Sequence, residues 1–117
     1  MTGHSLGGAL ASIASSAFIS QDIKVSETYT YGEPRNGNAI WAAYVNSQIP
    51  DDKYFRVTHF TDGATQIPPT SFGYAHHGPE YFQSKDSGNT AESTFKCDEN
   101  SSVGHYWRER MCRQYAE

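Results

Sequence analysis

The chain has 117 residues, 37% of them hydrophobic, which predicts one soluble domain at most, with a core of modest size. No apolar run in it is long enough to span a membrane. A net charge of −4 and 9 scattered basic residues argue against nucleic acid as a partner and suit a neutral or weakly polar substrate.

The first residues carry a nucleophile motif. Gly3-x-Ser5-x-Gly7 has the spacing of a nucleophile elbow, a tight strand-to-helix turn in which glycines avoid clashes around a serine. Such a turn exposes the Ser5 hydroxyl. It also leaves the amide of Leu6 at the positive end of a helix, where it can hold a developing oxyanion. The spacing therefore predicts Ser5 as a nucleophile and the Leu6 N–H as one donor of an oxyanion hole.

A helix is predicted directly after this motif, over residues 6–20. Apolar residues recur there at three- and four-residue steps and predict one buried stripe, formed by Leu6, Leu10, Ile13, Ala14, Ala17 and Phe18. Several other positions are small enough to let the helix lie close to a sheet, namely Gly8, Ala9, Ala11 and Ser12. Only four residues precede Ser5, so we expect the buried strand that feeds an elbow to be missing.

The following elements alternate between strands and helices. β-Branched and aromatic runs predict four strands, over residues 25–31, 54–60, 80–83 and 93–97. Asn38 can cap a helix over residues 38–48 that ends before Pro50, with an inward stripe of Ile40, Trp41, Tyr44 and Val45. A helix between two strands indicates parallel pairing, so the pattern predicts an α/β domain with a mainly parallel sheet. Residues 103–115 suit a terminal helix or an irregular tail.

A serine nucleophile needs a base and an acid that orients the base, and in elbow enzymes the acid comes first along the chain. Asp62 is the strongest candidate for the acid, because it follows a predicted strand at the edge where α/β sheets bind ligands. The alternative is that Asp62 only caps a turn before Gly63. The remaining aspartates fit solvated turns better, including Asp22, Asp51 and Asp52.

Three histidines follow Asp62 and are candidates for the base. His105, in the loop after the last predicted strand, is the first choice, and His76 is the second. His76 and His77 are adjacent, so in an extended segment they point to opposite faces and cannot both serve one site. A metal site built from His77 and Glu80 would lack a third ligand at a suitable spacing, so no metal or other cofactor is predicted.

The two cysteines lie near the carboxyl end. Asn100-Ser101-Ser102, an acceptor triplet for N-glycosylation, stands between Cys97 and Cys112. This combination is typical of a secreted protein with one disulfide. The stretch before Ser5 is too short to hold an export signal, so none is expected in the chain as it stands.

Four blocks of sequence, in this order, resemble the fungal class 3 lipases and are most similar to their feruloyl esterase branch: Thr2-Gly3-His4-Ser5-Leu6-Gly7-Gly8, Tyr29-Thr30-Tyr31-Gly32-Glu33-Pro34-Arg35-x-Gly37-Asn38, Phe55-Arg56-Val57-Thr58-His59-x-x-Asp62-Gly63 with Ile67-Pro68-Pro69, and Gly73-Tyr74-x-His76-x-x-x-Glu80-Tyr81. The resemblance implies an α/β-hydrolase fold and hydrolysis of carboxylic esters through an acyl-enzyme. It implies Ser5 as nucleophile, Asp62 as acid, His105 as base and a structural role for His76.

The chain departs from the family in three respects. It lacks the family's first strands, lid and second oxyanion donor, which makes residues 1–117 resemble the C-terminal part of a lipase domain. Gly104 precedes His105, where the family usually has Asp-x-His or Asp-His. The family's last cysteine usually bonds an upstream cysteine that this chain lacks. Cys112 therefore pairs with Cys97, stays free or finds another partner.

The resemblance leaves the function open between an acylglycerol lipase working at a lipid–water interface and a feruloyl esterase acting on plant cell-wall esters. A catalytically inert fragment is a further alternative. A module that only binds esters or carbohydrates is disfavoured, because binding alone would not require Ser5, Asp62 and a later histidine together. The family also implies a secreted protein.

Overall fold

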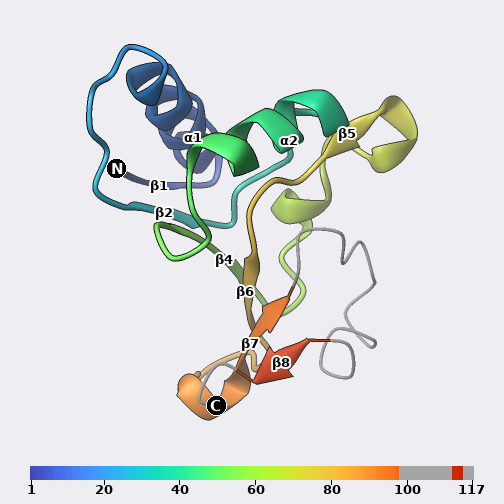
Figure 1. The fold of residues 1–117 in the computed structure, drawn as a ribbon. Helices are drawn as coiled ribbons and strands as arrows, with labels where there is room; N and C mark the ends of the chain where they lie inside the picture. The colour runs from blue at the N-terminus through green and yellow to red at the C-terminus, as the bar shows by residue number, and fades with distance from the viewer. Residues whose placement is uncertain (98–111, 115–117) are drawn as a thin grey trace.

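The computed structural model describes residues 1–97 and 112–114, which form a twisted sheet with helices on one face (Figure 1). The larger elements are β1 (Thr2–His4), α1 (Leu6–Ile19), β2 (Thr28–Tyr31), α2 (Ala39–Gln48), β4 (Tyr54–His59), β6 (Glu80–Gln83), β7 (Thr94–Cys97) and β8 (Arg113–Gln114). The short ones are β3 (Gly37–Asn38), β5 (Tyr74–Ala75) and the 3₁₀ turns η1 (Gly63–Gln66), η2 (Thr70–Phe72) and η3 (Ala91–Ser93). No helix within these ranges is both long and apolar enough to cross a membrane.

The six-stranded sheet has the order β1-β2-β4-β6-β7-β8. The first four strands are parallel to their neighbours, whereas β7 and β8 are antiparallel, so the predicted mainly parallel sheet is confirmed. A separate antiparallel ribbon pairs β3 with β5. Because β1, β2 and β4 run in the same direction, the residues that follow them meet at one edge of the sheet.

The elbow is fed by a short strand in which Thr2 and His4 are exposed, so the buried strand that we expected to be missing is not seen in the described chain. Thr2–His4 form β1, with Gly3 opposite Thr30 of β2. Three residues suffice because β2 supplies the pairing, and the Ser5 amide continues it by donating to the Tyr31 carbonyl at 2.8 Å. β1 is the outermost strand of the described sheet on this side.

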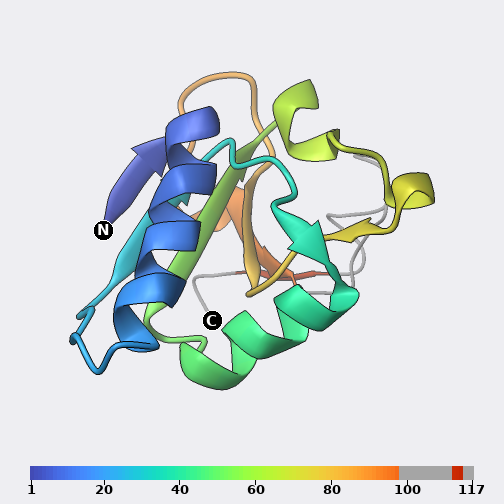
Figure 2. The ribbon, with the colours of Figure 1, turned by 90° about the horizontal axis from the view of Figure 1, so that it is seen from above.

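Helix α1 covers β1 and β2 (Figure 2), but the predicted buried stripe is wrong. The large apolar side chains on α1 face outward: Leu6 is 68% exposed, Leu10 58%, Ile13 47% and Phe18 39%. The buried positions are the small ones, Gly8, Ala9, Ala11, Ser12, Ser15 and Ser16. Small residues allow a closer approach to the sheet, and buried serines such as Ser15 have hydrogen-bond partners there. The face of α1 with small residues is therefore buried, and the face with large apolar residues is exposed.

Helix α2 begins as predicted, with the Asn38 side chain accepting the Trp41 N–H at 3.0 Å. Its predicted stripe is only partly buried. Val45 is 1% exposed and packs with Ile49 and Tyr54, while Ile40 is 80% exposed. Tyr44 also lies largely outside the core, at 41% exposure. A small apolar cluster therefore lies at the end of α2.

The sheet is polar on the face under the helices. The buried side chains of β2 and β4 on this face are Thr28, Thr30, Tyr54, Arg56 and Thr58. The alternating positions carry aromatic rings, with Tyr29 stacked on Phe55 at 4.6 Å between ring centroids and Phe55 packed against Tyr81 at 5.4 Å. A hydrogen bond between the Ser15 and Thr28 hydroxyls thus helps to hold α1 on the sheet, while α2 packs on it through Val45 and Tyr54.

The carboxyl end is fastened to the sheet by a disulfide between Cys97 and Cys112. This settles the pairing that the sequence left open. Within the predicted terminal segment, residues 113–114 form strand β8, where we expected a helix or an irregular tail. Residues 103–111 and 115 of that segment, and with them His105, lie outside the described residues.

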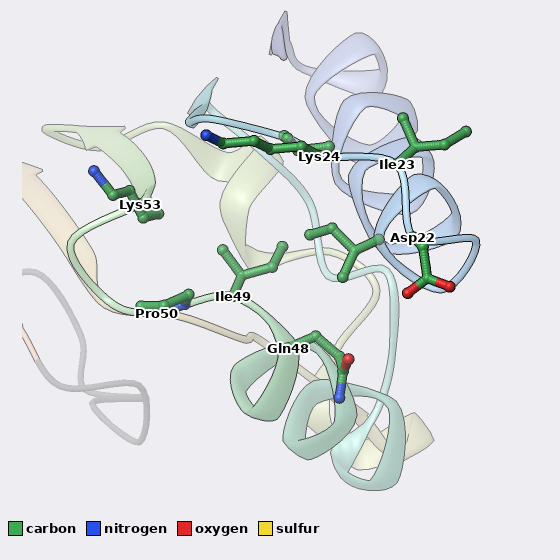
Figure 3. Close-up of a pocket in the computed structure, with 9 residues that line it drawn as sticks. Asp22, Ile23, Lys24, Gln48, Ile49, Pro50 and Lys53 are labelled. Carbon is green, nitrogen blue, oxygen red and sulfur yellow. The ribbon is translucent and has the colours of Figure 1, made fainter.

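A pocket of about 310 Å³ opens between the end of α1, the loop after it and the end of α2 (Figure 3). Its floor is apolar and includes Ile19 and Ile49, and Lys24 and Lys53 also line it. It lies at the opposite end of α1 from Ser5, about 20 Å away along a helix of this length. The pocket is therefore separate from the predicted nucleophile.

Candidate active site

Ser5 has the backbone conformation of an elbow. It stands between β1 and α1 with φ 53° and ψ −125°, a combination that non-glycine residues rarely adopt. Hydrogen bonds at both backbone groups of Ser5 offset the strain. Its amide donates to the Tyr31 carbonyl, and its carbonyl accepts the amides of Gly8 at 2.9 Å and Ala9 at 3.2 Å. The serine is consequently held at the amino end of α1, as the motif predicted.

The glycines of the motif have different roles. A Cβ on Gly3 would lie 2.1 Å from the Gly7 carbonyl oxygen, so the turn cannot accept a side chain there. Gly8 packs closely on β2, where its Cβ would lie 3.4 Å from the Cβ of Thr30. At Gly7 a Cβ would meet no described atom within 4 Å. The close approach predicted for both flanking glycines is therefore seen at Gly3 and not at Gly7.

The Leu6 amide is in the first turn of α1. Helix geometry gives the first amides no intrahelical acceptor, and the helix dipole makes this end positive. The backbone N–H of Leu6 follows directly after Ser5, so it is available to an oxygen that develops charge next to the serine hydroxyl. The role of the Leu6 N–H as an oxyanion donor stays a prediction, and its place at the start of α1 supports that prediction.

Asp62 lies beyond the end of β4, at the same edge of the sheet as Ser5. Its Oδ1 accepts the Ala64 N–H at 2.9 Å, so the side chain caps η1. Its Oδ2 lies against Gly32, where a Cβ would be only 2.6 Å away. Asp62 thus performs the turn-capping role that we considered as the alternative, and it does so with one oxygen. The other oxygen faces the space between the ends of β2 and β4.

Gly32 provides the room for this carboxylate. It directly follows β2, has φ +60°, and donates its amide to the Val57 carbonyl at 2.9 Å. The exposed His4 has its Nε2 3.8 Å from the position of a Gly32 Cβ. Ser5 and Asp62 follow strands separated by β2, so their backbones are roughly two strand spacings or 10 Å apart. An imidazole from another segment would be needed to connect them.

His105, the predicted base, lies outside the described residues, so its assignment stays a prediction. His76, the second choice, has another partner: its Nε2 is 2.7 Å from the Thr65 carbonyl oxygen. Burial and the positive charge of Arg56 lower the pKa of His76 to about 2. A general base should titrate near the working pH, so this environment argues against His76 as the base.

A buried polar cluster connects α1 to the sheet below the elbow. At its centre is the fully buried Glu33, whose Oε2 accepts the hydroxyls of Thr30 and of Tyr54, the latter at 2.8 Å. Its Oε1 accepts the Asn36 amide and lies 3.7 Å from Nε2 of His77. Burial raises the pKa of Glu33, and the hydrogen bond from Thr30 and the charge of Arg56 oppose that shift.

His77 belongs to this cluster. Its Nε2 is 2.9 Å from Oγ of Ser12, and burial and the charge of Arg56 lower its pKa to about 3. Glu80, the other residue of the metal site we considered, accepts the Thr58 hydroxyl at 2.8 Å. Within residues 1–97 and 112–114, no group of three or more His, Cys, Asp or Glu is arranged to hold a metal ion.

Sequence reasoning missed two parts of this site. One is Gly32, because nothing local in the sequence shows that it faces Asp62, 30 positions later. The role of Glu33 was also missed, although an acidic residue two positions after a predicted buried strand is a signal, because carboxylates are rarely buried without partners. Both roles depend on which strands are neighbours, which only the sheet order reveals.

The fold and the elbow define the chain as part of an α/β-hydrolase. A family model described as lipase (class 3) matches residues 1–72, and the protein belongs to this family. The secreted mono- and diacylglycerol lipase 1 of Fusarium solani is 45% identical over 82 residues, which are 70% of this chain and 24% of that lipase.

Solved structures agree with this family. A mutant form of the protein MDLA from Penicillium cyclopium superimposes with a TM-score of 0.79 at 32% identity, covering 86% of this chain and 37% of that one. A triacylglycerol lipase described as having a serine-protease triad at its catalytic centre gives a TM-score of 0.64 at 37% identity. That match covers 73% of this chain and 33% of the lipase. The chain thus spans between 24% and 37% of the length of these relatives.

Proposed function

We propose that the protein is a serine carboxylic ester hydrolase of the triacylglycerol lipase type. The observation that carries the proposal is the strained backbone of Ser5 at the amino end of α1, combined with the Asp62 carboxylate at the same sheet edge. Residues 1–117 would form the part of a lipase domain that starts at the elbow. As in the secreted lipases to which the chain is similar, we propose an extracellular site of action, on esters at a lipid–water interface.

In the proposed reaction His105 takes the proton of the Ser5 hydroxyl, and Oγ attacks the ester carbonyl carbon. The negative charge that develops on the carbonyl oxygen is held by the Leu6 N–H. His105 then gives its proton to the leaving alcohol, which produces an acyl-enzyme. A water molecule deprotonated by His105 releases the acid and regenerates Ser5. Oδ2 of Asp62 orients the imidazole throughout, while Oδ1 keeps the carboxylate on η1.

The test is turnover of p-nitrophenyl butyrate by the protein and by single variants. Ser5→Ala, Asp62→Asn and His105→Ala should each lower kcat by roughly 10⁴ while the chain stays folded. Ser20→Ala, an exposed serine at the other end of α1, is the control and should leave kcat unchanged. A folded wild-type protein without turnover would overturn the proposal in favour of a catalytically inert chain.

Two further measurements address substrate and base. Methyl ferulate is compared with p-nitrophenyl butyrate, and a clear preference for the ferulate would favour a feruloyl esterase, the alternative that the sequence left open. His76→Ala should lower kcat far less than His105→Ala. An active His105→Ala variant next to an inactive, folded His76→Ala variant would overturn the assignment of the base.

A further inference from the structure

The segment between β5 and β6 contacts several elements that otherwise have little connection. His76 reaches η1 through Nε2 and the Thr65 carbonyl at 2.7 Å, whereas His77 reaches α1 through Nε2 and Oγ of Ser12 at 2.9 Å. The His77 carbonyl accepts Nε of Arg56 at 3.2 Å, which fixes the segment on β4. Two adjacent residues therefore face opposite sides, as the sequence predicted for an extended pair.

His76 contacts the loop that carries the acid. A carbonyl oxygen can only accept, so Nε2 of His76 holds the proton and donates it to Thr65. The Thr65 hydroxyl in turn donates to the Asp62 carbonyl at 3.0 Å, and the Ala64 amide binds the Asp62 carboxylate. The position of η1, and with it that of Asp62, thus depends directly on the His76 ring.

His77 contacts the helix that carries the nucleophile. Ser12 is buried and lies seven residues after Ser5, which is two turns of α1. The ring is held from two other sides by edge contacts with Trp41 at 4.9 Å and Tyr54 at 4.8 Å between centroids. With a side chain 1% exposed, His77 has little freedom to move unless α1 moves too.

We propose that His76 and His77 form a positioning bridge that fixes the loop of Asp62 relative to the helix of Ser5. The inference rests on the proposed function insofar as Ser5 and Asp62 act in catalysis. Both rings use only Nε2, because Nδ1 of each is buried without a hydrogen-bond partner among the residues described. Both histidines remain neutral at ordinary pH, so the bridge does not change with protonation.

The first test uses a matched pair of serines on α1. Ser12→Ala removes the contact with His77, while Ser15→Ala removes similar buried bonds, namely the one between the Ser15 and Thr28 hydroxyls at 2.9 Å and the one that Ser15 donates to the Ala11 carbonyl at 2.8 Å. Hydrogen exchange of the Ala64 amide is measured by NMR in both variants. Ser12→Ala should accelerate this exchange about fivefold, the effect of losing roughly one hydrogen bond, and Ser15→Ala should not. Equal acceleration in both variants, or none in either, would overturn the bridge.

The second test separates positioning from general stability. His76→Leu removes the donor to Thr65, and His76→Gln keeps an N–H near the same place. In ester turnover, His76→Leu should lower kcat at least about tenfold with little change in KM, and His76→Gln should restore most of it. Equal kcat values for both variants would contradict the proposal. If the wild type shows no turnover, the proposed function fails, and the exchange of Ala64 still decides the bridge.

Discussion

The contact between Gly32 and Asp62 leads to a prediction with a built-in control. Gly32→Ala and Gly88→Ala both place a side chain at a left-handed backbone position, with φ +60° and +64° respectively. Each should therefore cost about 1 kcal/mol of the free energy of unfolding. Around Gly88 no described atom lies within 4 Å of the new Cβ, while at Gly32 that Cβ would be 2.6 Å from Oδ2 of Asp62.

The carboxylate must move to relieve this overlap. Ordinary contact begins near 3.4 Å, so Oδ2 has to shift by about 0.8 Å. The side chain can rotate at small energetic cost, but rotation weakens the bond from the Ala64 amide to Oδ1, a loss of about 1 kcal/mol. Gly32→Ala should thus cost about 2 kcal/mol in total, and the misplaced acid should lower kcat by roughly 10- to 100-fold.

The assays are urea denaturation followed by circular dichroism, and turnover of p-nitrophenyl butyrate. Gly88→Ala should lose stability and keep kcat, so the pair separates backbone strain from displacement of the acid. If both variants lose the same stability and keep the same kcat, then Asp62 either does not contact Gly32 or does not take part in catalysis. Either conclusion would refute the site described above.

Three further predictions concern the whole chain. Lowering the pH from 7 to 5 should reduce the free energy of unfolding by about 2 to 4 kcal/mol. The reason is that His76 and His77 bind protons near pH 6.5 in the unfolded chain, whereas in the folded chain both stay neutral because their pKa values are lowered. The raised pKa of Glu33 acts in the opposite direction and reduces this loss; unchanged urea midpoints would contradict the sign that the histidines set. Reduction of the bond between Cys97 and Cys112, 15 positions apart, should cost about 3 kcal/mol, visible as a lower urea midpoint with reductant. The exposed apolar side chains of α1 should make the chain prone to aggregation and able to bind the dye ANS; a sharp melt of a monomer without dye binding would count against this.

The element types could be predicted from local patterns, because strand and helix periods are short-range properties. β4 was expected over residues 54–60 and ends at His59, where the positive φ of Phe60 turns the chain. β2 is shorter than the predicted 25–31, since pairing with β4 begins only at Thr28. The helix cap at Asn38 could also be predicted, because the Asn38 side chain and the Trp41 N–H that it accepts lie only three positions apart.

The buried face of α1 could not be predicted in the same way. Apolar periodicity marks the side of a helix that avoids water, and it does not say which neighbour covers that side. On α1 the serine and alanine side packs on the sheet, where the Ser15 hydroxyl meets the Thr28 hydroxyl, and Leu10 is left exposed. Ser5 and Asp62 could be predicted as site residues because each follows a strand. The contacts of Glu33 and His77 could not, because they join segments far apart in the sequence.

The polar layer between α1 and the sheet has a consequence for how the sequence can change over generations. An apolar contact tolerates many side chains of similar volume, but a buried hydroxyl or carboxyl that loses its partner costs about 1 to 3 kcal/mol. Ser15 with Thr28, and Glu33 with Tyr54, should therefore be replaced together or not at all. Among relatives aligned over this layer, we expect substitutions at these positions to occur in pairs, while the exposed face of α1 varies freely.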